Sequence, residues 1–443
     1  MKISLSEHFD YKKLIKFTIP TIIMMIFTSI YGVVDGIFVS NIVGSDAFAS
    51  VNLIMPFIMI LGSIGFMIGT GGSALVSKTF GEGENKKANQ IFSMLIYFLI
   101  ITGVVLSVFG FIFIKPIAKL LGADSSTLTN CVIYGRVLLV ALVPFLLQNS
   151  FQSFLVVAEK PTMGLIISIV AGITNMILDF LFIYIFKMGV FGAALATGIS
   201  QLIGGIIPFI YFIRKNPTQL KLVKAKLDKK ALFQSCTNGS SEMLTNVSTS
   251  LVNMLYNMQL MKLVGADGVV AYGIIMYISF IFSGTYIGYS IGIAPIVGYH
   301  YGSDNKEELK NLLKKSLILI GIVSLSMTFL AELLSRPLAS IFVSYDKNLL
   351  DMTTTAIRLF SLSYIISGFN VFASSFFTAL NNGFVSALIS FLRTLVFQLA
   401  MILLLPMLFK LNGVWLAVVV AEILALFVSI LCFIMNRKKY EYI

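Results

Sequence analysis

Long apolar runs recur along the whole chain, and they limit its possible folds more than any other feature. About 20 apolar residues are enough for a helix to cross the ~30 Å hydrocarbon core of a bilayer. The runs are continuously apolar instead of alternating over ~10 residues, which favours helices over barrel strands. The sequence therefore predicts an all-α polytopic membrane protein with twelve transmembrane helices. These are expected at about 14–38, 51–76, 91–114, 131–157, 162–183, 189–213, 233–261, 269–297, 313–333, 353–380, 384–407 and 412–435.

The distribution of basic residues predicts the orientation. Charged residues are 12% of the chain, against about 25% in soluble domains. If the N-terminus is cytoplasmic, 23 of the 32 Lys and Arg residues lie at cytoplasmic ends, as the positive-inside rule requires. The first run lacks a small-residue cleavage site, so we expect an uncleaved helix. These features predict a multi-pass protein with both termini cytoplasmic. The net charge of +12 then suits anionic lipid and needs no nucleic acid.

The two halves of the chain resemble each other. "VGSDAFASVNLIM" (43–55) matches "VGADGVVAYGIIM" (264–276) at an offset of 221, and Gly81 aligns with Gly302. Six spans per half preserve orientation, so the repeats are parallel, related by an axis along the membrane normal. We expect a six-helix N-terminal lobe (1–213), a basic cytoplasmic linker (214–232) and a six-helix C-terminal lobe (233–443), around a central substrate cavity.

Acidic residues inside the spans mark a candidate ion site. Asn175 and Asp179 are four residues apart, so they share one helix face, and Thr197 and Gln201 form a similar pair on the next span. Asp35 lies toward the outer end of the first span. Intramembrane acids are costly and usually functional. Carboxylate, amide and hydroxyl oxygens suit a small hard cation, but the acids could instead carry a proton, because removal from water favours the neutral form. In a purely structural interpretation, Asn175 only satisfies a protonated Asp179.

Polar stripes mark two further spans. One runs along the seventh span from Glu242 to Asn257, and another along the tenth from Ser363 to Thr378. Such stripes face either a wet cavity or neighbouring helices. For the seventh span we favour the cavity, and for the tenth the two are equally balanced. The residues assigned to the substrate cavity are Tyr31, Gln148, Gln152, Gln201, Glu242, Asn246, Asn253, Tyr256, Asn370 and Ser374.

Other motifs are weak. "GTGGSA" (69–74) lacks the lysine of a Walker A loop and fits close helix packing better, so we do not expect ATP to be the energy source. His8 and His300 are far apart in sequence, and the three cysteines have no metal-binding spacing, so no metal cluster is expected. A membrane-embedded enzyme would need a nucleophile with a base, or a metal cluster; neither is visible.

"YGVVDGIFV" in the first span, "TNMILDFLF" in the fifth, and the twelve spans in two repeats resemble the multidrug and toxic compound extrusion (MATE) family over essentially the whole chain. The pattern of Asp35, Asn175, Asp179 and Thr197 is similar to the ion site of its DinF-like branch, where these positions bind Na⁺ or H⁺. Pro20 matches a first-span proline that bends there. Another branch of the family has an acid in the tenth span, and that acid is absent here. The acid Glu242 in the seventh span, in contrast, resembles a feature of that branch.

The resemblance implies a secondary active multidrug antiporter of a bacterial cytoplasmic membrane. It would export lipophilic, often cationic compounds in exchange for Na⁺ or H⁺ by alternating access, as a monomer and without a cofactor. The alternative is a flippase of lipid-linked metabolites. That activity requires several basic residues for a pyrophosphate, whereas the interior charges here are mostly acidic, with Arg393 the main exception.

Overall fold

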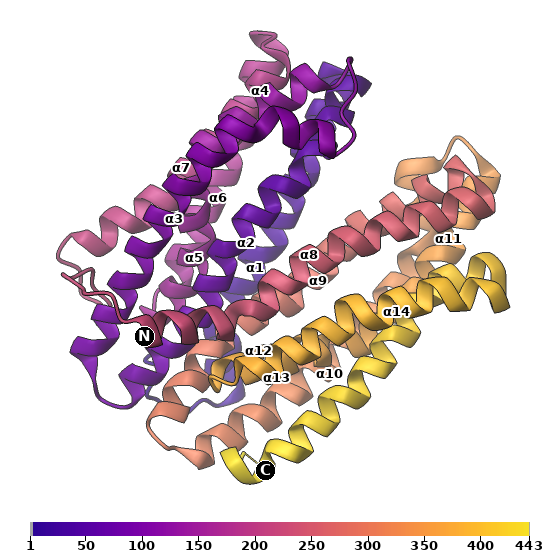
Figure 1. Ribbon diagram of the computed structural model, residues 1–443. Helices are drawn as coiled ribbons and strands as arrows, with labels where there is room; N and C mark the ends of the chain where they lie inside the picture. Colours follow the sequence, from indigo (N-terminus) through magenta and orange to yellow (C-terminus); the bar gives the residue numbers. More distant parts are fainter. Residues whose placement is uncertain (1–2, 443) are drawn as a thin grey trace.

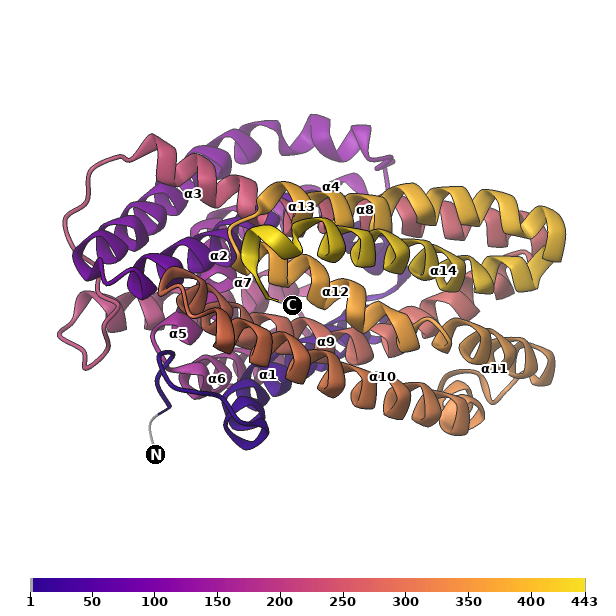
Figure 2. The ribbon, with the colours of Figure 1, turned by 90° about the horizontal axis from the view of Figure 1, so that it is seen from below.

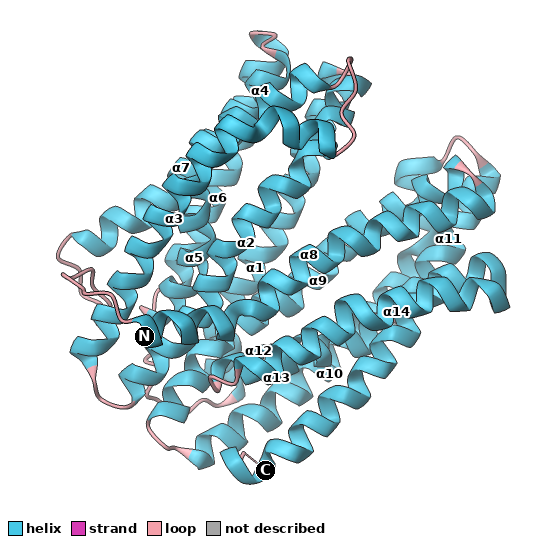
Figure 3. Cartoon of the chain, viewed as in Figure 1, coloured by secondary structure: helices cyan, strands magenta, loops and turns pink. Residues whose placement is uncertain are grey.

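The computed structural model describes residues 3–442, apart from the side chains at positions 33, 37, 40, 41, 45 and 46. Every regular element in this range is helical, which confirms the predicted fold class (Figure 3). Three π-helical segments, Val39–Val43, Phe180–Ile185 and Leu392–Val396, continue the α-helices before them. The α-helices are α1 (Tyr11–Phe38), α2 (Ser45–Gly81), α3 (Asn85–Leu120), α4 (Leu128–Val140), α5 (Leu142–Val157), α6 (Pro161–Asp179), α7 (Gly189–Ile213), α8 (Lys229–Val264), α9 (Ala266–Gly302), α10 (Lys306–Val343), α11 (Lys347–Ser361), α12 (Tyr364–Ala379), α13 (Gly383–Phe391) and α14 (Phe397–Tyr440).

The helices account for all twelve predicted spans. Within the described residues, eight helical stretches are long and apolar enough to cross a bilayer, and two bent pairs raise this number to ten. The stretch Gly383–Tyr440 counts once among these, but Lys410 breaks it with φ 51° and ψ −129°, and the chain turns back there (Figure 2). It therefore holds the last two predicted spans. The remaining span, 233–261, lies in α8, whose polar stripe makes it less apolar. The protein is thus a multi-pass membrane protein.

The internal repeat is visible in the irregular parts of the helices. The break between α4 and α5 bends the chain by 59°, and the break between α11 and α12 bends it by 46°. These breaks, at Ala141 and Leu362, keep the 221-residue offset. The turns after α2 and α9 hold left-handed residues at Gly83 and Asp304, again 221 residues apart. Equivalent positions therefore adopt equivalent backbone geometry in the two halves.

The helices form two groups that meet at one end. Helices α1–α7 pack among themselves, as do α8–α14, and the groups touch mainly where α2 packs along α8 and α9, and α1 along α9. In Figure 1 the groups approach each other at the end where both termini lie, and they diverge toward α4 and α11. We call the first end the termini end.

Glycines permit the contact at the termini end. A methyl group added at Gly81 would collide with the Tyr299 carbonyl of α9, and one added at Gly302 would collide with the Lys78 carbonyl of α2. Both glycine–carbonyl pairs are related by the repeat, so α2 and α9 cross symmetrically. Gly71 likewise lies against the backbone of Ser235 and Gly239 in α8. This confirms that the glycines of residues 69–74 serve close helix packing.

Candidate functional site in the first helix group

Two carboxyl groups face each other between α1 and α6. Asp35 lies on α1, and Asp179 is the last α-helical residue of α6, where the chain passes into the π-helical segment. Asp179 is fully buried and its carboxyl group contacts that of Asp35. Among the side chains that the structure describes, none donates a hydrogen bond to either oxygen of Asp179 or to Oδ1 of Asp35. The two acids, Asp179 fully buried and Asp35 half-buried, therefore form a pair without a neutralising partner in the described part of the chain.

Local packing brings α1 against α6. Gly172 of α6 leaves room for two rings of α1, because a Cβ at this position would lie 2.6 Å from the Phe27 ring and 2.9 Å from the Tyr31 ring. Phe27 and Tyr31 precede Asp35 by eight and four residues, and Gly172 precedes Asp179 by seven, so the ring contacts bring the two acids to similar levels. Tyr31, which the sequence assigns to the substrate cavity, thus lies beside Asp35.

The other predicted ion-site residues complete this cluster. Asn175 is one turn before Asp179 and 1% exposed, and neither atom of its amide has a partner among the described residues. Thr197 of α7 lies beside the hydroxyl group of Tyr134, which in turn interacts electrostatically with Asp35 and Asp179. The structure therefore brings together oxygen-bearing side chains from α1, α4, α6 and α7.

Tyr134 is a member of the cluster that the sequence did not reveal. It lies on α4 and is fully buried, with its hydroxyl 4.0 Å from the Met55 sulfur. A single tyrosine in an apolar run is ordinary, so no pattern marks it.

The chemistry of the cluster suits a small positive charge. A buried polar group without a hydrogen bond costs about 1–3 kcal/mol, and more if it is charged. Several such groups in one place indicate a ligand that satisfies them together. Carboxyl, amide and hydroxyl oxygens can coordinate a small cation, and two facing carboxyl groups can share a proton.

A second polar network lies in the other helix group. Arg393 Nε donates to Glu422 Oε1 and Oε2 at 2.9 and 3.0 Å. Asn370 Nδ2 donates to Glu422 Oε2 at 2.7 Å, and Ser429 donates to Asn370 Oδ1 at 2.9 Å. Glu242 of α8 is within electrostatic range of Arg393. In contrast to the first cluster, this network contains its own cation.

The predicted stripe on the tenth span mostly joins helices. Asn370 is fully buried, and Ser374 is bonded to Ser386 and Ser390 at 2.9 and 2.8 Å. The bonds of Ser374 connect α12 to α13, and those of Asn370 connect it to α14.

On α8 the stripe is mixed. Glu242 and Asn246 are half-buried, and Asn246 Nδ2 donates to the Glu242 carbonyl at 2.8 Å. Asn253 accepts from the Tyr272 hydroxyl at 2.8 Å, and the Tyr256 hydroxyl donates to Gln398 at 3.3 Å.

The predicted glutamines lie inside the first helix group. Gln148 and Gln152 of α5 line a narrow crevice with residues of α6 and α7, and Gln148 packs against Gly204. Gln201 of α7 is 7% exposed. The Oε1 atoms of all three have no partner among the described side chains.

Comparison with known proteins finds one family and its members. The MatE family model matches residues 20–181 and 243–404, one segment in each half of the chain. The multidrug export protein MepA of Staphylococcus saprophyticus is 24% identical over 436 residues, which cover 97% of this chain and 94% of that protein.

Two solved structures share the fold. One is a crystal structure of MATE in complex with MaL6, with a TM-score of 0.93 and 22% identity over 98% of both chains. The other is an outward-facing conformation of a multidrug resistance MATE family transporter, with a TM-score of 0.92 and 22% identity over 98% of both chains. Because the family model matches most of both halves, the chain belongs to the MatE family.

Proposed function

We propose that this protein exports lipophilic, often cationic compounds across a bacterial cytoplasmic membrane in exchange for Na⁺ or H⁺. It is a transporter, and its relative from Staphylococcus saprophyticus is named a multidrug export protein. The observation that carries the exchange mechanism is the acid pair of the half-buried Asp35 and the buried Asp179, which has no cationic side chain bonded to it in the described residues. An ion that enters from the outer side can bind to this pair, and a drug cation that enters from the cytoplasm can replace it.

The cycle follows from competition for this charge. A cation or proton enters the site around Asp35, Asn175, Asp179 and Thr197 from the outer side and neutralises the carboxyl groups. α1 carries both Asp35 and Pro20, and a proline weakens a helix where it removes a hydrogen bond. Binding therefore repositions α1 and displaces the drug outward. The protein then reorients, and drug binding on the cytoplasmic side completes the exchange.

Orientation follows from charge. With the termini in the cytoplasm, 23 of the 32 Lys and Arg residues lie at cytoplasmic ends. The helix groups, which touch at the termini end, are then closed toward the cytoplasm, as expected for an outward-facing state (Figure 1). We propose that residues 1–213 and 233–443 act as two lobes joined by the linker 214–232, in a monomer. The coupling ion serves without a further cofactor, and no nucleic acid takes part.

The drug site is proposed to lie between the lobes. Of the predicted cavity residues, its wall would take the half-buried Tyr31 from the first lobe and Glu242, Asn246 and Asn253 from the second. The others lie inside one lobe, namely Gln148, Gln152, Gln201, Tyr256, Asn370 and Ser374. Glu242 and the acid pair place negative charge on opposite lobes, which favours a cationic substrate.

A lipid-linked metabolite flippase remains the alternative. A pyrophosphate would require free basic groups in the interior. Arg393 is bound to Glu422 and faces Glu242, so its charge is already balanced. The charge distribution therefore favours cations over pyrophosphates.

The proposal is tested in a bacterial strain that lacks its own ethidium exporters. Cells that produce the native protein should accumulate less ethidium than cells with an empty vector, and Asp35→Asn should abolish the difference. Asp304→Asn, in the turn after α9, is the matched control and should behave as native. Equal accumulation with native protein and empty vector would exclude ethidium export and direct attention to lipid-linked substrates.

A further inference from the structure

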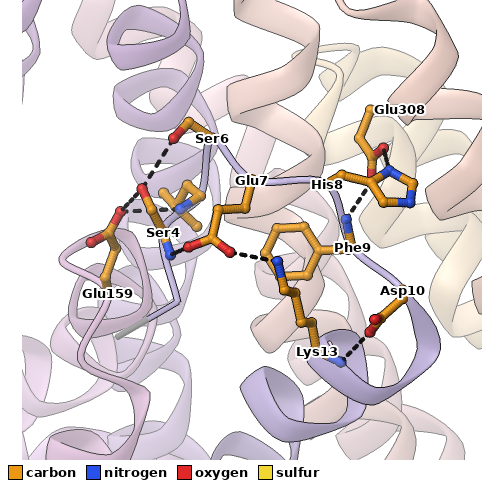
Figure 4. A network of polar contacts seen from close by, with 10 residues as sticks. Ser4, Ser6, Glu7, His8, Phe9, Asp10, Lys13, Glu159 and Glu308 are labelled. Atoms are coloured by element: carbon orange, nitrogen blue, oxygen red, sulfur yellow. Dashed lines mark hydrogen bonds and ion pairs between the residues drawn. The ribbon is translucent and has the colours of Figure 1, made fainter. Parts of the chain in front are cut away.

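The segment before α1 contacts the opposite helix group (Figure 4). Phe9 is fully buried, and its N–H donates to Glu308 Oε1 of α10 at 2.9 Å. The Phe9 carbonyl accepts hydrogen bonds from Asn311 Nδ2 at 3.0 Å and Lys315 Nζ at 2.6 Å, both on α10. His8 Nδ1 lies 2.6 Å from Glu308 Oε2. The chain thus binds the second lobe before it enters the first.

The beginning of the same segment is held by the first lobe. Ser4 Oγ donates to Glu159 Oε1 at 2.7 Å, and the Leu5 N–H donates to the same oxygen at 3.0 Å (Figure 4). Glu159 lies in the turn between α5 and α6. Residues 3–10 therefore bridge the two lobes at the termini end.

Apolar packing reinforces this bridge. Leu5 and Phe9 join a hydrophobic cluster that includes Val156 of α5. The same cluster contains Leu309, Leu312 and Leu313 of α10. Burial of leucine and phenylalanine side chains removes apolar surface from water and so stabilises the contact. The segment is thus a packed part of the inter-lobe contact.

The linker mirrors this arrangement. It precedes α8, the first helix of the second lobe, and packs on α3 of the first lobe. The Lys221 N–H donates to Asn89 Oδ1 at 2.6 Å, and the Val223 N–H donates to Ser93 Oγ at 2.8 Å. In each half, the segment before the first helix thus binds the third helix of the other half. For the linker this follows from connectivity, but for residues 3–10 it does not.

We propose that residues 3–10 form an N-terminal latch that holds the two lobes together at the termini end and leaves α10 each time this end opens. The proposal rests on the alternating-access function above. Glu308 is 5% exposed and binds His8, the Phe9 N–H and Asn311. A buried carboxylate with several donors does not give them up while it stays out of water. The latch therefore opens only when the lobes separate, and it stabilises the outward-facing state.

A cysteine reporter tests the latch without drug or ion gradient. Ser77 of α2 is fully buried, next to Gly298 of α9. In a chain whose three native cysteines are replaced by alanine, Ser77→Cys should react with a maleimide only when the termini end opens. Glu308→Ala should raise the labelling rate about tenfold, since hydrogen bonds to a charged group are worth about 1.5 kcal/mol or more. Phe9→Ala should act in the same direction and serves if Glu308→Ala fails to fold.

Glu307→Ala is the matched control, because Glu307 is the exposed neighbour of Glu308 on α10. It should leave the labelling rate at the native value. Native labelling rates in folded Glu308→Ala and Phe9→Ala variants would overturn the latch. Faster labelling in a protein that exports no drug would leave the latch standing and remove the proposed function instead.

Cross-linking gives the opposite perturbation. A reducible thiol cross-linker that joins His8→Cys to Glu308→Cys should stop ethidium export, and reductant should restore it. The control pair Asn382→Cys and Asn436→Cys joins neighbouring residues within the second lobe. Its cross-linking should leave export unchanged. Export at the native rate through a cross-linked latch would show that α10 need not leave the segment, and would refute the proposal.

Discussion

Asp35 and Asp179 are side by side in a place where two negative charges are unfavourable. Two like charges 4 Å apart repel by about 4 kcal/mol at an effective dielectric constant of 20. A cation between the carboxyl groups, or a shared proton, removes this repulsion. In the proposed exchange a drug cation does the same, and ion and drug then exclude each other at this pair.

Tyr134 provides a test of the cluster at a position that carries no charge. Tyr134→Phe keeps the buried ring and removes the hydroxyl that lies beside Thr197. A neutral hydrogen bond contributes about 1 kcal/mol, so the ion concentration for half-maximal export should rise about fivefold. Tyr289→Phe, which removes a buried hydroxyl bonded to Ser316 in the second lobe, should leave it unchanged. If Tyr134→Phe leaves the ion concentration for half-maximal export unchanged, the Tyr134 hydroxyl does not take part in ion binding.

The sequence marked some of these residues and not others. An acid in a 20-residue apolar run is conspicuous, and the four-residue spacing of Asn175 and Asp179 places both on one face. Tyr134 approaches the acids only through the packing of α4 against α7, which no local pattern encodes. The same holds for Arg393 and Glu422, whose 29-residue separation crosses the break at Lys410.

At the scale of elements, the crossing of α2 and α9 controls how closely the lobes approach. Gly81 and Gly302 leave no room for a side chain against the opposite backbone. We predict that Gly302→Val separates the lobes at the termini end, raises maleimide labelling of Ser77→Cys and reduces export. Gly273→Val on the same helix is the control, because no atom of a neighbouring described residue lies within 4 Å of its added Cβ. Slow labelling in folded Gly302→Val would mean that the crossing tolerates a side chain.

The Arg393–Glu422 pair connects the π-helical segment Leu392–Val396 to the second half of α14. Glu422 is 4% exposed and Arg393 18%. Arg393→Met leaves a buried carboxylate without its partner and should lower the free energy of unfolding by about 3 kcal/mol. Adding Glu422→Gln should recover most of this loss. Arg336→Met, which breaks the exposed pair with Asp351, should cost less than about 1 kcal/mol. Thermal unfolding in detergent measures all three, and equal stability of native protein and Arg393→Met would contradict the role of the pair.

At the scale of the whole molecule, hydropathy and the internal repeat were enough to predict twelve spans in two related halves. Each span is a local property of its sequence, and the 221-residue offset relates one half to the other. The contact of residues 3–10 with α10 could not be predicted, because it joins positions about 300 residues apart through single hydrogen bonds. The bend between α11 and α12 could not be predicted either, because both helices lie in one apolar run and no proline marks the break.

Exchange of a single ion at the acid cluster predicts how export responds to voltage. Ethidium carries one positive charge, so its exchange for one Na⁺ or H⁺ moves no net charge. The ~2.3 kcal/mol per 100 mV of membrane potential then cancels. At a fixed ion gradient, a potassium–valinomycin potential imposed on proteoliposomes should leave the ethidium export rate unchanged. A rate that rises with inside-negative potential during inward ion flux would indicate two ions per drug.

Gradient-driven ethidium export from proteoliposomes tests the central claim, that the acid pair couples ion entry to drug exit. A Na⁺ gradient and a pH gradient are imposed separately on native protein, Asp179→Asn and the control Asp304→Asn. We predict that one gradient drives export by the native protein and the control, and that Asp179→Asn loses this response while it still folds and binds ethidium. Export by Asp179→Asn at the native rate under the same gradient would contradict the claim.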